Sequence, residues 1–166
     1  MSNMNTVCIT GHRPAKLPWG YKTNGIKYIR YRRELKKYIK HYIKAGYLNF
    51  ISGMALGVDM DFAELVLLLK DKYNLTLECV IPCPNQTKMW TKEQIDRYNN
   101  IIKRADKTTL VSDHYFHSCM IVRNKYMVDC ADTVLAVWNG EEKGGTWQTI
   151  NYAKRKKKKI DIIYIG

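Results

Sequence analysis

Apolar runs rich in β-branched residues alternate along this chain with stretches whose apolar positions recur at helical spacing. The runs at 6–10, 48–52, 75–81, 108–112, 133–138 and 160–165 predict strands. Helical spacing predicts helices over 26–45, 58–73, 92–105, 119–131 and 146–158. Strands and helices that alternate in this way are typical of a parallel sheet covered on both faces. We therefore predict one α/β domain over residues 1–166.

The first long helix carries much of the positive charge of the chain. The chain has 28 Lys and Arg against 15 Asp and Glu, a formal net charge of +13. Apolar positions such as Leu35, Ile39 and Tyr42 follow helical spacing, so the lysines between them belong to an outer, solvated face. A second basic block, KRKKKK at 154–159, lies between a predicted helix and a predicted strand. The charge favours anionic partners but is only weak evidence for nucleic acid.

Glycine, proline and polar residues gather where the predicted strands end. Four such segments each follow a strand: TGHRP, SGMALGVD, PCPNQTKMW and NGEEKGGT. The starts of the strands show no such gathering of glycine, proline and polar residues. Parallel sheets bind ligands at the carboxyl ends of their strands. This asymmetry predicts a ligand site at that edge of the sheet.

Two of these segments combine glycine turns with the start of a helix. Gly53 and Gly57 permit unusual backbone angles and a close approach to the backbone, and Asp59 in the following first turn either caps the helix or contacts a ligand. Gly144, Gly145 and Thr146 repeat the arrangement with a hydroxyl group. Free N–H groups at helix starts favour an anion, so together the turns indicate a cradle for phosphate or ribose. Neither matches the dinucleotide-binding or P-loop pattern.

Several other side chains near the strand ends could contact a ligand. Arg13 could bind phosphate or form a surface salt bridge, and His12 could donate to phosphate or satisfy a local carbonyl. Arg123 on an apolar helix needs either a buried carboxylate or a bound anion. Trp90 and Trp138 could stack on a base or pack in the core.

The remaining chemistry of the sequence is limited. The five cysteines form no paired CxxC pattern, so we expect buried, reduced thiols rather than a zinc site, and we predict no metal and no cofactor. No catalytic triad, HExxH motif or clear carboxylate pair is present. There is no secretory signal and no apolar run long enough to span a membrane, which predicts a cytoplasmic protein.

Five motifs follow one another along the chain: TGHRP, SGMALGVDMDFAE, the P…Q…W pattern after the third strand, MIVRNKYMVD and GGT. In this order they resemble the SLOG superfamily, which includes the DprA/Smf and LOG proteins. They are most similar to its YpsA-like branch. The resemblance spans nearly the whole chain and implies a Rossmann-like sheet with a pocket for nucleotides or nucleotide-derived ligands.

LOG-type enzymes cleave the N-glycosidic bond of nucleoside monophosphates with an arginine and a glutamate. The resemblance places the arginine at Arg123, but Thr149 stands at the glutamate position and Asn124 replaces the usual lysine. A threonine cannot supply the carboxylate that such hydrolysis uses. We therefore assign no catalytic residue.

These observations predict binding of a nucleotide or an ADP-ribose-like or cyclic derivative, by a protein that senses or sequesters a nucleotide signal. A phosphoribohydrolase and a single-stranded DNA-binding module are the alternatives, and a homo-oligomer is left open. The predicted ligand-binding residues are Thr10, Gly11, His12, Arg13, Ser52, Gly53, Met54, Gly57, Asp59, Gln86, Trp90, Arg123, Asn124, Trp138, Gly144, Gly145 and Thr146.

Overall fold

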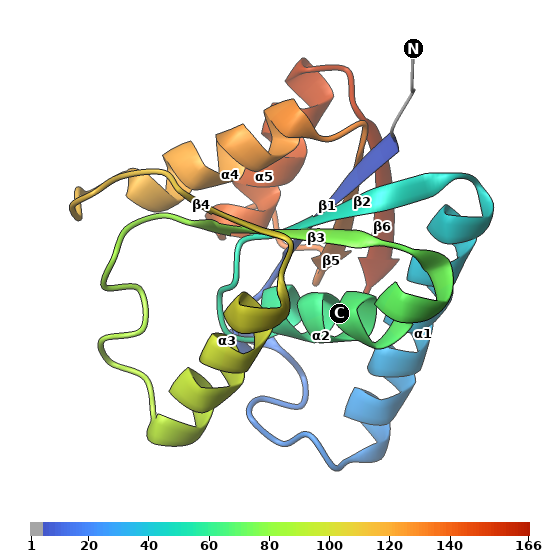
Figure 1. Ribbon diagram of the computed structural model, residues 1–166, viewed down its shortest axis with the longest axis horizontal. Coiled ribbons are helices and arrows are strands. Elements are labelled where there is room, and N and C mark those ends of the chain that lie inside the picture. The colour runs from blue at the N-terminus through green and yellow to red at the C-terminus, as the bar shows by residue number, and fades with distance from the viewer. Residues whose placement is uncertain (1–4) are drawn as a thin grey trace.

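The protein is a three-layer α/β structure built on one parallel sheet. A computed structural model describes residues 5–166, and in that range the six strands have the order β4-β3-β2-β1-β5-β6. Helices α1, α2 and α3 cover one face, and α4 and α5 cover the other (Figure 1). The predicted Rossmann-like parallel sheet with helices on both faces is confirmed.

The predicted elements are all present, with shifts of a few residues at their ends. The strands are β1 (Asn5–Gly11), β2 (Tyr47–Ser52), β3 (Thr76–Ile81), β4 (Lys107–Leu110), β5 (Thr133–Trp138) and β6 (Lys159–Tyr164). The helices are α1 (Ile26–Lys44), α2 (Val58–Tyr73), α3 (Lys92–Arg104), α4 (Cys119–Cys130) and α5 (Gly144–Arg155), with a short 3₁₀ helix η1 (Pro14–Lys16). The main difference is at α5, which begins at Gly144 rather than Thr146 and ends before most of the lysine block.

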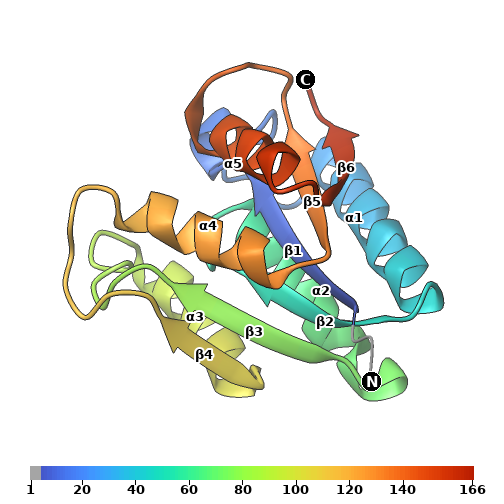
Figure 2. The same ribbon diagram turned by 90° about the horizontal axis from the view of Figure 1, so that it is seen from above.

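The order of the strands explains where a ligand site can form. From β1 to β4 the chain builds the sheet in one direction, and it then returns to place β5 on the other side of β1 (Figure 2). Connections after β1 and β5 therefore leave the sheet toward opposite faces, which opens a crevice at their carboxyl ends. All six residues of β5 are buried, as expected for a strand covered on both faces.

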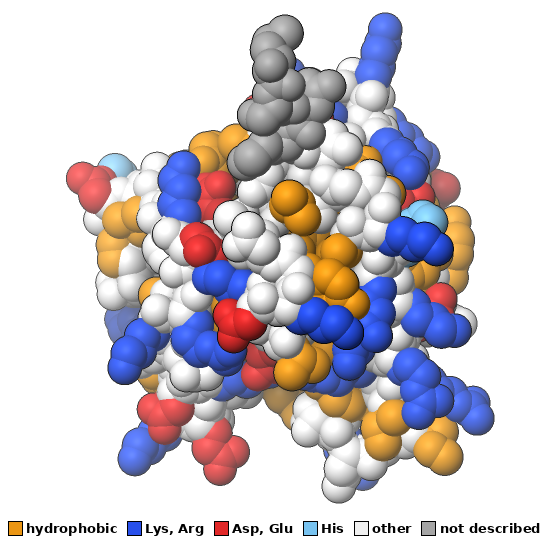
Figure 3. Space-filling model, turned by 45° about the vertical axis from the view of Figure 1, so that its right-hand side comes forward, with side chains coloured by type: hydrophobic (Ala, Val, Ile, Leu, Met, Phe, Trp, Pro, Cys, Tyr) orange, Lys and Arg blue, Asp and Glu red, His pale blue; other side chains and the backbone are white. Residues whose placement is uncertain are grey.

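The core lies on both sides of the sheet. Tyr28, Tyr31, Leu35, Ile39 and Tyr42 form the buried stripe of α1, at the spacing that the sequence predicts. Most charged residues of α1 are exposed, whereas Arg32 turns toward Glu64 of α2. In the face shown in Figure 3, Lys and Arg side chains stand at several places with acidic side chains among them, rather than in one continuous patch.

The cysteine prediction is confirmed at every position except the last. Cys8, Cys79, Cys83 and Cys119 are buried free thiols. Burial raises the pKa of Cys79 to about 12, which keeps this thiol protonated. Cys130 is exposed because it ends α4 at the surface.

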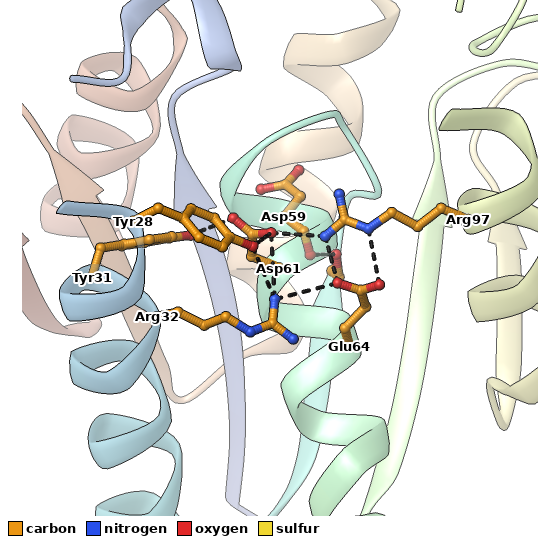
Figure 4. Close-up of polar contacts among 8 residues, drawn as sticks. Tyr28, Tyr31, Arg32, Asp59, Asp61, Glu64 and Arg97 are labelled. Carbon is orange, nitrogen blue, oxygen red and sulfur yellow. Dashed lines mark hydrogen bonds and ion pairs between the residues drawn. The ribbon is translucent and has the colours of Figure 1, made fainter. Parts of the chain in front are cut away.

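A buried ion network joins the three helices of one face. Asp61 of α2 accepts hydrogen bonds from Tyr28 (3.0 Å), Tyr31 (2.9 Å) and Arg97 (2.7 Å) (Figure 4). Glu64, one turn further along α2, accepts a bond from Nε of Arg97 at 2.9 Å. The network therefore fixes α1 and α3 against α2, the helix that begins at the predicted ligand site.

We expect Asp61→Ala to lower the free energy of unfolding by about 3 kcal/mol, because it leaves the buried hydroxyl groups of Tyr28 and Tyr31 without their acceptor and leaves Arg97 with Glu64 alone. Urea denaturation measures this change. Asp71→Ala is the matched control, since Asp71 is an exposed carboxylate of the same helix and should change stability by less than about 0.5 kcal/mol. Equal effects of the two substitutions would contradict the role given to Asp61.

Glu64 makes the network sensitive to acid. Burial by itself raises the pKa of Glu64, but hydrogen bonds and positive charge from Arg97 and Arg32 outweigh it, so the pKa lies below its ordinary value of 4.5. A carboxylate with a lowered pKa in the folded state stabilises the protein above its unfolded pKa, and this contribution is lost as the pH falls through the folded pKa. The difference in stability between wild type and Glu64→Gln should therefore be largest above pH 4.5 and should shrink below it. Urea titrations across that range test this, and a difference that grows on acidification would contradict it.

Candidate functional site

A cavity of about 370 Å³ lies at the carboxyl ends of β1 and β5, where the strand order reverses. This is the position at which open parallel sheets bind ligands. Its walls come from the segment after β1, the turn before α2, the first half of α4 and the start of α5. The lining residues are Ile9, Thr10, Gly11, His12, Arg13, Ala15, Lys16, Ala55, Asp59, Met120, Ile121, Arg123, Asn124, Gly145, Thr146 and Gln148.

Positive charge dominates the cavity wall. Arg13 and Lys16 come from the segment after β1, and Arg123 comes from α4. Asp59 is the only carboxylate residue among those that line the cavity. The Arg13 guanidinium contacts the Met120 sulfur, and in the described part of the chain no carboxylate pairs with it. The cavity therefore has the charge expected of a site for an anion.

The start of α5 is open to this cavity. A Cβ placed on Gly145 would meet no atom within 4 Å, and the first turn of the helix carries no acidic residue. Lys16 reaches over the same turn, since its Nζ would lie 3.0 Å from a Cβ on Gly144. The N–H groups of a helix start, the helix dipole and a lysine together favour a phosphate or carboxylate group at this point.

The start of α2 differs, although its sequence also combines glycine with a helix start. Asp59 and Asp61 lie in its first turn, so the helix already carries its own negative charge. The Val58 N–H group points at the carbonyl of His12 at a long 3.4 Å. Of the two glycine turns, the one at α5 is thus better suited to an external anion.

The glycines before α2 make room for the protein itself. A Cβ on Gly53 would lie 2.7 Å from Nη1 of Arg123 and 3.0 Å from the Asp59 carboxylate. At Gly57 it would lie 2.6 Å from the carbonyl oxygen of His12, and the φ angle of +94° also favours glycine. The sequence predicted open space for a ligand beside both glycines, whereas the structure fills that space with the chain's own groups.

Arg123 and Asp59 form the charged floor of the cavity. Arg123 is 4% exposed; its Nη1 donates to the Gly53 carbonyl, and its Nε donates to the Asn124 side chain at 2.8 Å. Burial lowers the pKa of Arg123, and the nearby Asp59 charge opposes this. Burial raises the pKa of Asp59, and the charge of Arg123 offsets part of the shift. The pair thus balances charge below the surface, while Arg13 and Lys16 lie exposed at the mouth.

His12 orients a hydroxyl group at the start of α5. Its Nε2 accepts the Asn139 N–H at 3.1 Å, so in the neutral ring the proton is on Nδ1, which lies 3.5 Å from Oγ1 of Thr146. Burial and the charge of Lys16 lower the pKa of His12, which favours the neutral ring. With Nδ1–H directed at Oγ1, the Thr146 hydroxyl is left to donate its own proton into the cavity.

The structure brings together only part of the predicted residue set. The predicted residues that line the cavity are Thr10, Gly11, His12, Arg13, Asp59, Arg123, Asn124, Gly145 and Thr146. Ser52 is fully buried and holds the turn before α2: its hydroxyl donates to the Asp59 carbonyl at 2.8 Å and accepts the Met54 N–H at 3.2 Å. Gly53, Met54, Gly57 and Gly144 support the turns behind the lining residues.

The two tryptophans that were predicted as stacking residues have different surroundings. Trp138 is buried against Trp147, with ring centroids 5.2 Å apart, and its Nε1 donates to the Glu141 carbonyl at 2.9 Å. Trp138 therefore lies outside the cavity lining. Trp90 and Gln86 line a groove that adjoins the cavity.

Sequence reasoning missed the two polar lining residues Lys16 and Gln148, as well as the apolar residues Ile9, Ala15, Ala55, Met120 and Ile121. Lys16 follows Pro14 and Ala15 in the one-turn helix η1, which folds the segment back over the cavity. Its signal was a lysine shortly after TGHRP, but only the turn places it near α5. Gln148 lies three residues after Gly145, about one turn further along α5, so helical spacing from Gly145 could have indicated it.

Thr149 does not line the cavity. It is buried, and its hydroxyl donates to the Gly145 carbonyl at 2.9 Å, which is an internal bond of α5. Among residues 5–166, no group of three or more His, Cys, Asp or Glu side chains could hold a metal ion. In the same range, every helix is too short or too polar to cross a membrane.

Comparisons with known proteins agree with this fold and its motifs. Over 167 residues the chain is 27% identical to a UPF0398 protein of Macrococcus caseolyticus (strain JCSC5402), covering 96% of this chain and 90% of the relative. It is 30% identical over 120 residues to the uncharacterized SPbeta prophage-derived protein YoqJ of Bacillus subtilis (strain 168), covering 64% of this chain and 70% of that protein.

A solved structure with a similar fold is the X-ray structure of DNA processing protein A (DprA) from Streptococcus pneumoniae. The TM-score is 0.67 at 13% sequence identity, with 96% of this chain covered. This chain spans 50% of the length of that solved chain, and at this identity the likeness concerns the fold alone.

The family comparison covers nearly the whole chain. The model of the YspA SLOG family, YpsA, matches residues 7–165 and confirms the superfamily and branch predicted from the motifs. Such membership is consistent with nucleotide- or DNA-related binding. The chain therefore belongs to the YspA SLOG family.

Proposed function

We propose that this protein binds a nucleotide or a nucleotide-derived ligand, of the ADP-ribose-like or cyclic kind, in the cavity at the ends of β1 and β5. The observation that carries this proposal is the cationic cavity itself: Arg13, Lys16 and Arg123 line the same cavity as the open helix start at Gly145. A protein that binds such a ligand without changing it acts as a sensor or by sequestering a nucleotide signal.

The charges within the cavity suggest how such a ligand is oriented. A phosphate fits at the start of α5, where backbone N–H groups, the Thr146 hydroxyl and Lys16 converge. Asp59 lies across the cavity and would repel phosphate, but its carboxylate can accept hydrogen bonds from ribose hydroxyl groups. A nucleotide carries both groups, which favours it over a simple anion such as inorganic phosphate.

Binding of single-stranded DNA is the second candidate. The solved protein of similar fold is named a DNA processing protein. Beside the cavity, Lys125, Arg155 and Lys156 lie 5.4–5.6 Å from the centre of the Tyr152 ring, and such a basic and aromatic surface suits single strands. DNA affinity from this surface should fall steeply with salt, because it depends on the release of counterions.

We expect Gly145→Val to weaken binding of the best ligand in a nucleotide panel by at least tenfold, because the new side chain occupies the position proposed for phosphate. The fold should survive, since the space beside Gly145 is open and its backbone does not require glycine. Calorimetric titration at low and high salt measures the affinity, with circular dichroism and urea denaturation as fold controls.

Gly25→Val is the matched control for this experiment. Gly25 is the N-cap residue of α1 and, like Gly145 in the first turn of α5, has open space beside it, but it does not line the cavity. Its substitution should leave the affinity unchanged. If the protein binds DNA tightly, if Gly145→Val leaves this DNA affinity unchanged, and if no nucleotide binds, the DNA-binding proposal would replace the nucleotide proposal.

We further expect no release of free base from AMP beyond the uncatalysed rate. Thr149 supplies no carboxylate, and the charge of Asp59, the carboxylate residue among those that line the cavity, is balanced by the nearby Arg123. Chromatography of AMP incubated with the protein checks this. Turnover that Asp59→Asn abolishes would show that Asp59 acts as the catalytic carboxylate and would establish a phosphoribohydrolase.

A further inference from the structure

A groove of about 210 Å³ adjoins the cavity on the side of the loop after β3. Arg13, Ala15, Ala55 and Met120 line both hollows, so a ligand held in the cavity can extend past Arg13 into the groove. The far walls of this side groove come from Tyr21, Gln86 and Trp90. None of these three side chains has a role in the phosphate site.

The side-chain oxygen of Gln86 is a hydrogen-bond acceptor that has no donor. Its Nε2 donates to the Met54 carbonyl at 2.7 Å, which fixes the orientation of the amide and identifies the other atom as Oε1. Among residues 5–166, Oε1 of Gln86 is the buried side-chain polar atom without a hydrogen-bond partner. A buried acceptor in this state is costly, and a ligand donor that displaces the side chains covering Oε1 from the groove would remove that cost.

The same groove offers aromatic surface beside this acceptor. Trp90 is held in place by Tyr98, which meets it edge-on with ring centroids 5.5 Å apart. Tyr21 is 66% exposed, although it belongs to a groove wall. An aromatic face next to a fixed amide acceptor suits a flat heterocycle that carries an N–H donor.

We propose that the side groove binds the base of the ligand and selects bases with an exocyclic amino group, which donates to Oε1 of Gln86 while the base stacks on Trp90. This inference rests on the proposed function, in which the phosphate of the same ligand is held at the start of α5. Arg13, which lines both hollows, lies between the phosphate and the base. Gln86 keeps its bond to Met54, so its Oε1 is a fixed acceptor that rejects a base with a carbonyl oxygen at the same place.

The test compares AMP, IMP and ribose 5-phosphate by calorimetric titration against the full chain. IMP differs from AMP in carrying a ring oxo group where AMP has its amino group, and ribose 5-phosphate has no base. We expect AMP to bind about tenfold more tightly than IMP. Ribose 5-phosphate should bind more weakly than AMP but should still bind, and its affinity should fall with Gly145→Val.

Two variants separate the two parts of the proposal. Gln86→Met keeps the length of the side chain but removes the acceptor, so it should bring the AMP to IMP ratio close to one and leave ribose 5-phosphate unchanged. Trp90→Leu should weaken AMP and IMP by a similar factor, about tenfold, and leave their ratio intact. Circular dichroism and urea denaturation show whether each variant is folded.

The outcomes distinguish this inference from the proposed function. Equal affinities for AMP and IMP in the wild type, with Gly145-dependent binding of ribose 5-phosphate, would overturn base selection by Gln86 and leave the phosphate site standing. Discrimination that survives Gln86→Met would overturn the residue assignment. Failure of all three compounds to bind would overturn this inference, and failure of the whole nucleotide panel would overturn the proposed function as well.

Discussion

The arrangement of the site depends on the contact of the Arg123 guanidinium with the turn between β2 and α2. Arg123 reaches from α4, on one face of the sheet, to this turn at the sheet edge, where it donates to the Gly53 carbonyl. The guanidinium takes the space that any side chain at position 53 would need. Its charge also makes a buried Asp59 tolerable, since an isolated carboxylate there would be strongly disfavoured. The buried Arg123 guanidinium thus fixes the turn before α2, stabilises the charge of Asp59 and forms one wall of the cavity.

The two helix starts near the cavity, those of α2 and α5, differ in the charge that surrounds them. The start of α2 carries two carboxylates, Asp59 and Asp61, which serve Arg123 on one side and the network with Arg97 on the other. The start of α5 has no acidic residue and lies next to Lys16. Negative charge from outside is therefore attracted to α5 and repelled from α2. This polarity would give the proposed nucleotide ligand one preferred direction, with its phosphate at α5 and its hydroxyl groups toward Asp59.

Thr149 stands at the position where the resemblance to LOG-type enzymes implies a catalytic glutamate. A glutamate at position 149 would introduce a carboxylate on α5, whereas Thr149 turns its hydroxyl back onto the Gly145 carbonyl. That bond supports the same helix turn that is proposed to hold phosphate. The residue that departs from the enzyme pattern therefore contributes to the helix start.

The sequence alone determined the layers of the fold and the edge of the sheet where the cavity lies. Three local patterns carry this information: strand periodicity, the spacing of Leu35, Ile39 and Tyr42, and the glycine and polar residues that gather at the strand ends but not at the strand starts. Because they are local, they can be recognised from the sequence alone. Only the tertiary structure decided which glycine is open, Gly145, and which is filled by another part of the chain, Gly53. It likewise buried Trp138 against Trp147 and brought Lys16 over α5. These outcomes depend on contacts between elements far apart in the chain, because what fills the space beside a residue is set by the helix that packs there and not by its neighbours in sequence.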